Sequence, residues 1–234
     1  MKPLILALAC ATALGFALPA AAAVVPPSEQ GFLTGTTSAQ RPELDGVVLA
    51  DLLTPYSITI ADLGRSASGV LQSRVVRSNA TGTLDFYWRI IPDADSQLDL
   101  FGFSVDPWTG VAVDTDFQTD GLGDYGPDRF VNNAGIQSAF DATWYFHPPS
   151  ANADTYFFFA RTDATAYALN TTFYLGVDGQ APTGGSIFAG YAEGLTFAPT
   201  VAGVPEPGAW VLMIAGFGLV GAGLRRRRTI GLAA

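Results

Sequence analysis

The central part of the chain alternates between apolar and polar residues with a period of two. These runs are rich in β-branched and aromatic side chains, and turn-forming residues such as Asp106-Pro107 and the stretch from Pro182 to Gly185 separate them. The pattern is typical of β-strands that bury one face. It predicts nine short strands, within residues 56–60, 69–75, 83–90, 98–105, 111–117, 142–146, 155–159, 172–175 and 186–189.

No part of this region shows a convincing 3.6-residue stripe, so we expect no amphipathic helix there. Nine short strands at close spacing predict an all-β fold, either an antiparallel β-sandwich or a jelly-roll-like body. The region from Val24 to Val204 has about 180 residues, which is enough to bury a full core as one domain. The sequence therefore predicts a single β domain over residues 24–204.

Residues 1–23 have the pattern of a cleaved secretory signal peptide. Lys2 supplies a minimal positive charge, Leu4 to Leu18 form a short apolar core, and small residues from Ala20 to Ala23 follow. This order of features predicts a signal helix that signal peptidase removes, which would leave a mature chain that starts near Val24. The chain is thus expected to be exported.

A second membrane-active pattern occupies residues 205–234. Pro205 to Pro207 form an extended spacer, because proline fixes φ and disfavours helix in the residue before it. Sixteen uncharged residues, Ala209 to Leu224, follow, and then Arg225 to Arg228. As a helix the uncharged run would be about 24 Å long, which predicts a short transmembrane helix. The positive-inside rule keeps the arginines in the cytoplasm and places the body on the other side of the membrane.

This tail resembles the PEP-CTERM sorting signal, in the PEPxxW form found in many Gram-negative secreted proteins. The resemblance rests on the glycine-rich apolar run and on Pro205, Glu206, Pro207, Trp210, Arg225, Arg226, Arg227 and Arg228. It departs at Val211, where that form usually has alanine. The resemblance implies that a membrane-embedded exosortase recognises the tail as a substrate. The protein would stay in the inner membrane only transiently, and would then reach the cell surface or the medium alongside exopolysaccharide.

Charge and cysteine content change once both ends are set aside. Between Val24 and Val204 the chain has seven arginines, no lysine and twenty acidic residues, a formal charge of −13. Such a surface repels phosphate backbones, so nucleic-acid binding is not expected. The single cysteine, Cys10, lies in the signal peptide, which leaves the mature chain without a thiol for disulfides, catalysis or zinc.

One predicted loop is unusually rich in carboxylates, and its candidate metal ligands are Asp114, Asp116, Asp120 and Asp124. Alternating carboxylates followed by glycine suit a hard cation that binds several oxygen ligands. Residues 116–121 imitate the first half of an EF-hand loop, but a proline stands where the bidentate glutamate should be. An irregular calcium loop and a solvated acidic loop without metal both remain as interpretations. Calcium could bridge an acidic body to an acidic polysaccharide.

Most aromatic residues are expected in the core, including Phe157 to Phe159. Trp88, Trp108 and Trp144 are candidates for stacking on sugar rings, and Trp108 lies in a Pro-Trp-Thr-Gly turn that favours exposure. His147 is the sole histidine, and the sequence has no G-x-S-x-G elbow. The expected function is therefore an exported, non-catalytic surface or matrix protein without a cofactor. A carbohydrate-binding module is the alternative, and a secreted acidic glycosidase with paired carboxylates is a further one.

Overall fold

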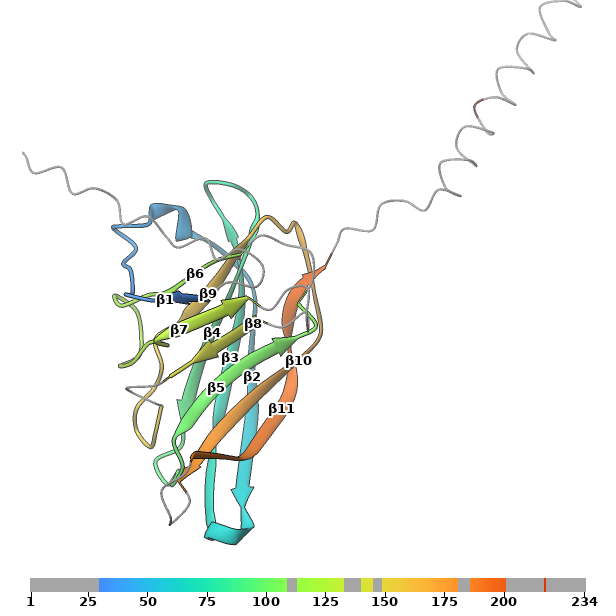
Figure 1. Ribbon diagram of the computed structural model, residues 1–234. Helices are drawn as coiled ribbons and strands as arrows, with labels where there is room; N and C mark the ends of the chain where they lie inside the picture. Colours follow the sequence, from blue (N-terminus) through green and yellow to red (C-terminus); the bar gives the residue numbers. More distant parts are fainter. Residues whose placement is uncertain are drawn as a thin grey trace, which may run out of the picture.

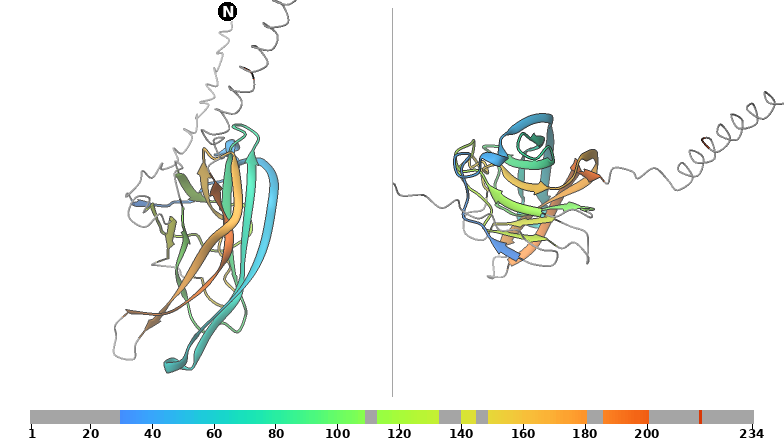
Figure 2. Two further views of the ribbon diagram at one scale, coloured as in Figure 1. Left: turned by 90° about the vertical axis from the view of Figure 1, so that its right-hand side faces the viewer. Right: turned by 90° about the horizontal axis from the view of Figure 1, so that it is seen from above.

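The computed structural model describes residues 30–108, 113–132, 140–144, 149–180, 186–200 and 217. The described body consists of two antiparallel β-sheets that face each other (Figures 1 and 2). The six-stranded sheet has the order β1-β7-β8-β5-β10-β11, and the five-stranded sheet has the order β2-β3-β4-β9-β6. The predicted all-β antiparallel fold is therefore confirmed.

The strands are β1 (Gln30–Phe32), β2 (Gly46–Ile60), β3 (Arg65–Ser78), β4 (Leu84–Pro92), β5 (Leu100–Asp106), β6 (Val113–Phe117), β7 (Arg129–Asn132), β8 (Phe140–Thr143), β9 (Phe158–Thr162), β10 (Ala166–Gln180) and β11 (Ser186–Thr200). Two short 3-10 helices, η1 (Pro42–Leu44) and η2 (Ala61–Leu63), flank β2. Each of the nine predicted strands overlaps an observed one. The short strands β1 and β7 were not predicted, and β2, β10 and β11 extend well beyond their predicted lengths.

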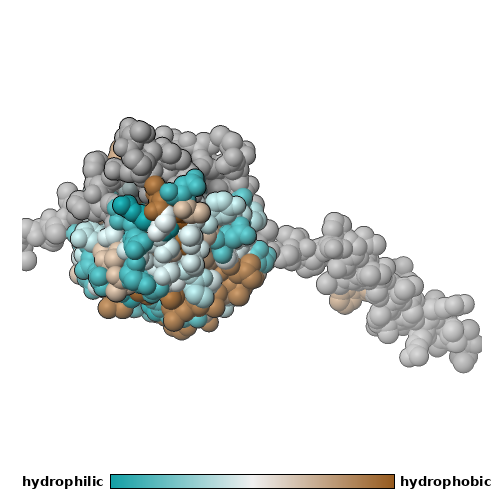
Figure 3. Space-filling model, turned by 90° about the horizontal axis from the view of Figure 1, so that it is seen from below, coloured by the Kyte–Doolittle hydropathy of each residue, from teal (hydrophilic) through white to brown (hydrophobic). Residues whose placement is uncertain are grey.

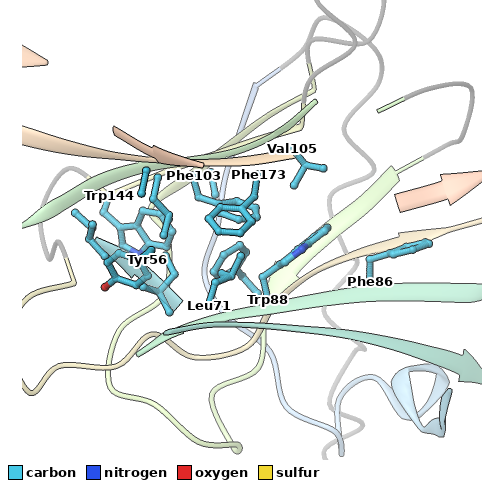
Figure 4. Close-up of a cluster of buried hydrophobic side chains, with 14 of the residues drawn as sticks. Tyr56, Leu71, Phe86, Trp88, Phe103, Val105, Trp144 and Phe173 are labelled. Carbon is cyan, nitrogen blue, oxygen red and sulfur yellow. The ribbon is translucent and has the colours of Figure 1, made fainter. Parts of the chain in front are cut away.

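The main core lies between the two sheets and is dominated by aromatic rings. Trp88, Phe86 and Leu71 from the five-stranded sheet meet Phe103 and Phe173 from the six-stranded sheet (Figure 4). The Trp88 and Phe103 ring centroids are 5.4 Å apart. Large aromatic side chains remove about 150–250 Å² each from water, so these rings supply much of the stabilising free energy of the body.

A hydrogen-bonded group of polar side chains crosses this core. Trp88 Nε1 donates to Thr196 Oγ1 at 2.9 Å, and Ser73 Oγ also lies 2.9 Å from Thr196 Oγ1. Thr196 belongs to β11, whereas Ser73 and Trp88 belong to β3 and β4. The buried polar atoms thereby satisfy one another, as burial requires, and they join the two sheets.

The segment between β1 and β2, residues 33–45, is called the strap here because it connects both sheets. At its start, β1 pairs with β7 of the six-stranded sheet. Further on, Thr36 forms a bridge with Gln118, which follows β6 of the five-stranded sheet. Its last turn, η1, lies on the outer face of that sheet, where Leu44 packs into a second apolar cluster with Val76, Tyr87, Phe157 and Phe159.

Within the described residues, no helix is both long enough and apolar enough to cross a membrane. The predicted signal peptide, residues 1–23, lies outside the described part of the chain. The predicted transmembrane helix, residues 209–224, also lies outside it, except for Phe217.

Candidate functional site

A pocket of about 280 Å³ opens on the outer face of the five-stranded sheet, beside the strap. Its volume is near the lower end of the range for small-molecule sites, roughly 300–1,000 Å³. It is lined by apolar side chains of the second cluster, by the end of the strap and by polar groups, namely Ser38, Leu44, Asp45, Gly46, Arg74, Val76, Tyr87, Gln118 and Phe157. An apolar lining with a few polar groups is the usual composition of a binding site.

Arg74 is the cation of this pocket, and its position is fixed by the sheet. The register of β2, β3 and β4 places Arg74 between Asp51 and Tyr87. Its Nε and Nη2 donate to Asp51 Oδ2 at 3.0 and 2.5 Å, and its guanidinium lies 4.8 Å from the centre of the Phe157 ring. Arg74 is partly exposed, so the ion pair and the ring hold a charged donor group at the pocket rim.

Hydrogen-bond donors and acceptors therefore line the pocket together with buried apolar side chains. The carboxylate of Asp45 accepts hydrogen bonds, the guanidinium of Arg74 donates them, and the amide of Gln118 and the hydroxyl of Ser38 do both. A ligand with several hydroxyl groups and an apolar face would match this lining better than a purely apolar or a highly charged one.

Five charged residues gather under the strap, next to the pocket. Asp85, Arg161 and Asp114 lie opposite one another on β4, β9 and β6. Arg41 of the strap donates to Asp114 Oδ2 at 2.5 Å and to Glu43 Oε1 at 2.9 Å. Its guanidinium also lies 5.4 Å from the centre of the Phe159 ring. Since Arg41 is buried, these partners compensate for the loss of its hydration, and the ion pair with Asp114 of β6 fastens the strap to the sheet.

Asp85 is the group in this cluster whose titration is most perturbed. Its side chain is fully buried, and neither carboxylate oxygen makes a hydrogen bond of ordinary geometry. Burial raises its pKa to about 7, although the Arg161 guanidinium and the Thr162 backbone amide act in the opposite direction. When Asp85 is protonated, the two arginines balance Glu43 and Asp114, and the cluster has no net charge.

The four predicted calcium ligands do not converge on one point. Asp114 binds Arg41, Asp116 Oδ1 accepts from the Gly35 backbone amide at 3.0 Å, and Asp120 Oδ2 accepts from the Ser38 backbone amide at 2.8 Å. Asp124 is exposed. Over the described ranges, no three acidic, histidine or cysteine side chains form a group that could hold a metal ion. Three of the four carboxylates instead bind the strap, so the calcium hypothesis gains no support from their geometry.

The prediction of an exposed Trp108 is wrong. Trp108 is only 1% exposed, and its ring packs 5.4 Å from that of Phe86 and 5.8 Å from that of Trp88. Trp88 and Trp144 are buried in the same core, which leaves none of the three for stacking on a ligand. His147 lies outside the described residues.

The sequence did not reveal the pocket residues Arg74, Tyr87, Phe157 and Gln118. They come from two strands and two loops, and they meet only through strand pairing and the position of the strap. Arg74 did carry one weak signal, since it occupies a polar position of an alternating strand and must point away from the core.

The fold defines this protein as an acidic β-sandwich with a strap-bounded pocket, and the tail adds its class. Residues 203–228 match the family described as the PEP-CTERM protein-sorting motif. The chain therefore carries a PEP-CTERM sorting signal, and the predicted resemblance is confirmed. This motif implies export and processing by an exosortase, a membrane protein. Its residues, from Pro205 to Arg228, lie outside the described part of the chain apart from Phe217. Neither curated proteins nor solved structures match this chain.

Proposed function

We propose that the exported body is a non-catalytic cell-surface or matrix protein that associates with exopolysaccharide through the pocket beside the strap. The observation that carries this proposal is the lining of the pocket. It combines Arg74, Asp45 and Gln118 at the rim with Tyr87 and Phe157 at the floor. Sugar hydroxyl groups both donate and accept hydrogen bonds, so they can use donors and acceptors of this lining, and the apolar faces of sugar rings can pack on its apolar side chains.

The position of Asp85 favours binding over hydrolysis. Its pKa of about 7 would suit a general acid at neutral pH. Its side chain, however, is fully buried under the strap and cannot reach a glycosidic oxygen. A glycosidase also needs a second carboxylate across a cleft from the acid. Asp114, the acidic residue nearest in sheet register, binds Arg41 instead.

A pull-down of the mature exported protein on exopolysaccharide from its own host would test this function. Arg74→Ala should weaken retention by about fivefold or more, because it removes a charged donor from the rim. Arg77→Ala is the matched control: Arg77 lies on the same strand, is exposed and does not line the pocket. It should bind as the unmodified protein does. Thermal unfolding of both variants would show that they fold.

The same samples distinguish binding in the pocket from binding elsewhere on the body and from glycosidase activity. Equal retention of the Arg74→Ala and Arg77→Ala variants would show that the pocket is not the binding site. Shortening of the polysaccharide during incubation would contradict the non-catalytic proposal and would indicate a glycosidase.

A further inference from the structure

Exposed apolar side chains gather where the two sheets meet along one side of the sandwich. β2 and β11 are the end strands of their sheets, and they pack against each other. Their exposed large apolar residues are Val47, Val48, Leu49 and Leu53 of β2, and Tyr191 and Leu195 of β11. We call these six residues the apolar seam. They are between 36% and 66% exposed, so the seam is a real surface feature and not the edge of the core.

In Figure 3, hydrophobic residues lie along the lower and right-hand rim of the body. The right-hand side is the one on which β10 and β11 lie in Figure 1. Large apolar patches on exported proteins commonly mark contacts with another apolar surface.

The relative direction of β11 and β2 follows from two contacts. A Cβ atom on Gly190 would lie 2.9 Å from Ile58, near the end of β2, and Thr54 Oγ1 donates to the Leu195 carbonyl oxygen at 3.5 Å. β11 therefore runs antiparallel to β2. By Thr196, β11 has crossed onto Ser73 of β3 and Trp88 of β4, so its last residue, Thr200, lies several strands away from Val47 to Leu49.

A separate chain of contacts leads to the same end of the sandwich. Thr200 pairs with Ala166 of β10, and two residues earlier the Ala164 carbonyl accepts from the Leu84 amide at 2.9 Å. Leu84 pairs with Arg77, which pairs with Val47. In Figure 1, β11 accordingly ends in the upper part of the body, on the right, and the turn between β3 and β4 forms the top of the body.

The length of sequence after Thr200 places this end near the membrane. Four residues, Val201 to Val204, precede Pro205, and the uncharged run begins at Ala209. Nine residues span at most about 32 Å when fully extended. While the tail is inserted, Thr200 therefore stays within that distance of the bilayer, and the end of the sandwich at which β2 begins faces the same side. Such tethering raises the effective concentration of the surface, so a few apolar contacts are enough for binding.

The distribution of charge permits a lipid contact on this side. The body as a whole is strongly acidic and would be repelled by anionic lipid. β2 and β11 together contain only two ionisable carboxylates, Asp51 and Glu193, and Asp51 is paired with Arg74. The acidic charge of the body lies mainly on other elements.

We infer that the apolar seam rests on the lipid surface of the inner membrane, on the side of the exported body, until the tail is cleaved. The inference relies on the sorting motif for the position of the tail and is independent of polysaccharide binding. It gives the seam a specific occupant: the headgroup and upper acyl region of the outer leaflet, into which Val47, Leu49 and Leu195 insert.

Site-specific fluorescence would test this contact in the full chain. Cys10→Ser removes the only cysteine, and Leu49→Cys, Leu195→Cys or Leu122→Cys then adds a single labelling site. Leu122 is the matched control, because it is 62% exposed and follows β6, which lies at the opposite edge of the five-stranded sheet from β2. Each protein carries an environment-sensitive fluorophore and is reconstituted with its tail into phosphatidylcholine vesicles that contain spin-labelled lipid.

Lipid contact predicts at least about threefold stronger quenching at positions 49 and 195 than at position 122, with loss of the difference when the tail is cut by protease. Equal quenching at all three positions would overturn the inference. Shielding of positions 49 and 195 from a water-soluble quencher without lipid quenching would also overturn it, since it would indicate a second copy or the exosortase as the partner. Either result would leave the polysaccharide pull-down unaffected.

Discussion

At the scale of single residues, Asp85 couples the stability of the body to pH. The folded state holds the Asp85 proton up to a pKa of about 7, whereas its ordinary value is 3.8. Between these values the folded state binds one more proton than the unfolded state. The contribution of Asp85 to the free energy of unfolding therefore falls as pH rises from about 4 to about 7, and it is fully present only below about pH 4.

Asp85→Asn should remove this dependence. Between about pH 4 and pH 7, the unmodified protein should lose stability relative to the variant as pH rises. The loss should be up to about 1.4 kcal/mol in unfolding free energy per pH unit. Urea unfolding at several pH values measures it. A curve for Asp85→Asn that stays parallel to that of the unmodified protein would contradict the role assigned to Asp85.

Arg41 makes a different kind of contribution, because its charge is buried and holds the strap. Arg41→Met keeps much of the side-chain volume but leaves Asp114 and Glu43 without their strap partner. We expect a loss of about 2–4 kcal/mol of stability, somewhat less than for a fully buried pair because both carboxylates are partly exposed. Limited proteolysis should cut first within residues 33–45. Unchanged protection of this segment would mean that Leu44 and the backbone contacts hold the strap without Arg41.

At the scale of elements, the sequence predicted the strands wherever alternation was regular. In β4 the alternate residues Phe86, Trp88 and Ile90 all enter the main core, and this period-two alternation predicted the strand. β2 was predicted only in its last five residues, 56–60, because the residues before them do not alternate regularly; a bulge between Val48 and Ala50 is one interruption.

β11 was missed over most of its length because its glycines resemble turn residues. A Cβ atom on Gly194 would lie 2.7 Å from the Phe173 ring, and one on Gly190 would lie 2.9 Å from Ile58. These positions need glycine because β11 approaches neighbouring side chains closely within a continuous strand. Period-two alternation and turn propensity cannot separate this use of glycine from a loop.

The hydrogen bonds of Thr196 give β11 a specific role in joining the sheets. Thr196→Val keeps the shape but deprives the Ser73 hydroxyl and the Trp88 indole of their common partner. We expect a loss of about 1–3 kcal/mol in the free energy of unfolding, measured by urea denaturation. Adding Ser73→Ala should recover part of this loss, because one unsatisfied group is removed. Additive losses in the double variant would show that Ser73 and Thr196 act independently.

At the scale of the whole molecule, the candidate site could not be read from the sequence. For the four aspartates, the sequence left two interpretations open, an irregular calcium loop and a solvated acidic loop without metal. In the structure, Asp114, Asp116 and Asp120 all bind the strap, which lies about 80 residues earlier in the chain. The sequence spacing of carboxylates within one loop indicates how close they can lie to each other. It does not indicate which distant segment of the chain packs against them.

The sorting signal makes a prediction for the exported protein as a whole. Mature material from the cell surface or the medium should lack the segment that contains Arg225 to Arg228, because exosortase processing removes it. Mass spectrometry of intact protein would measure this. Recovery of the full tail through Ala234 would leave a plain membrane anchor as the remaining interpretation. Replacing Pro205 and Pro207 by alanine should cause the unprocessed form to accumulate in the membrane fraction.

The packing of the first long strand, β2, against the last one, β11, also fixes an order of events in time. Thr54 and Leu195 are 141 residues apart in the sequence. β11 can therefore pack on β2 only after almost the whole body has crossed the membrane. β11 leaves the translocation channel only a few residues ahead of the sorting signal. Closure of the sandwich and arrival of the signal at the membrane are therefore nearly simultaneous. A chain that stalls earlier during export would present an open, protease-sensitive body and no signal for the exosortase.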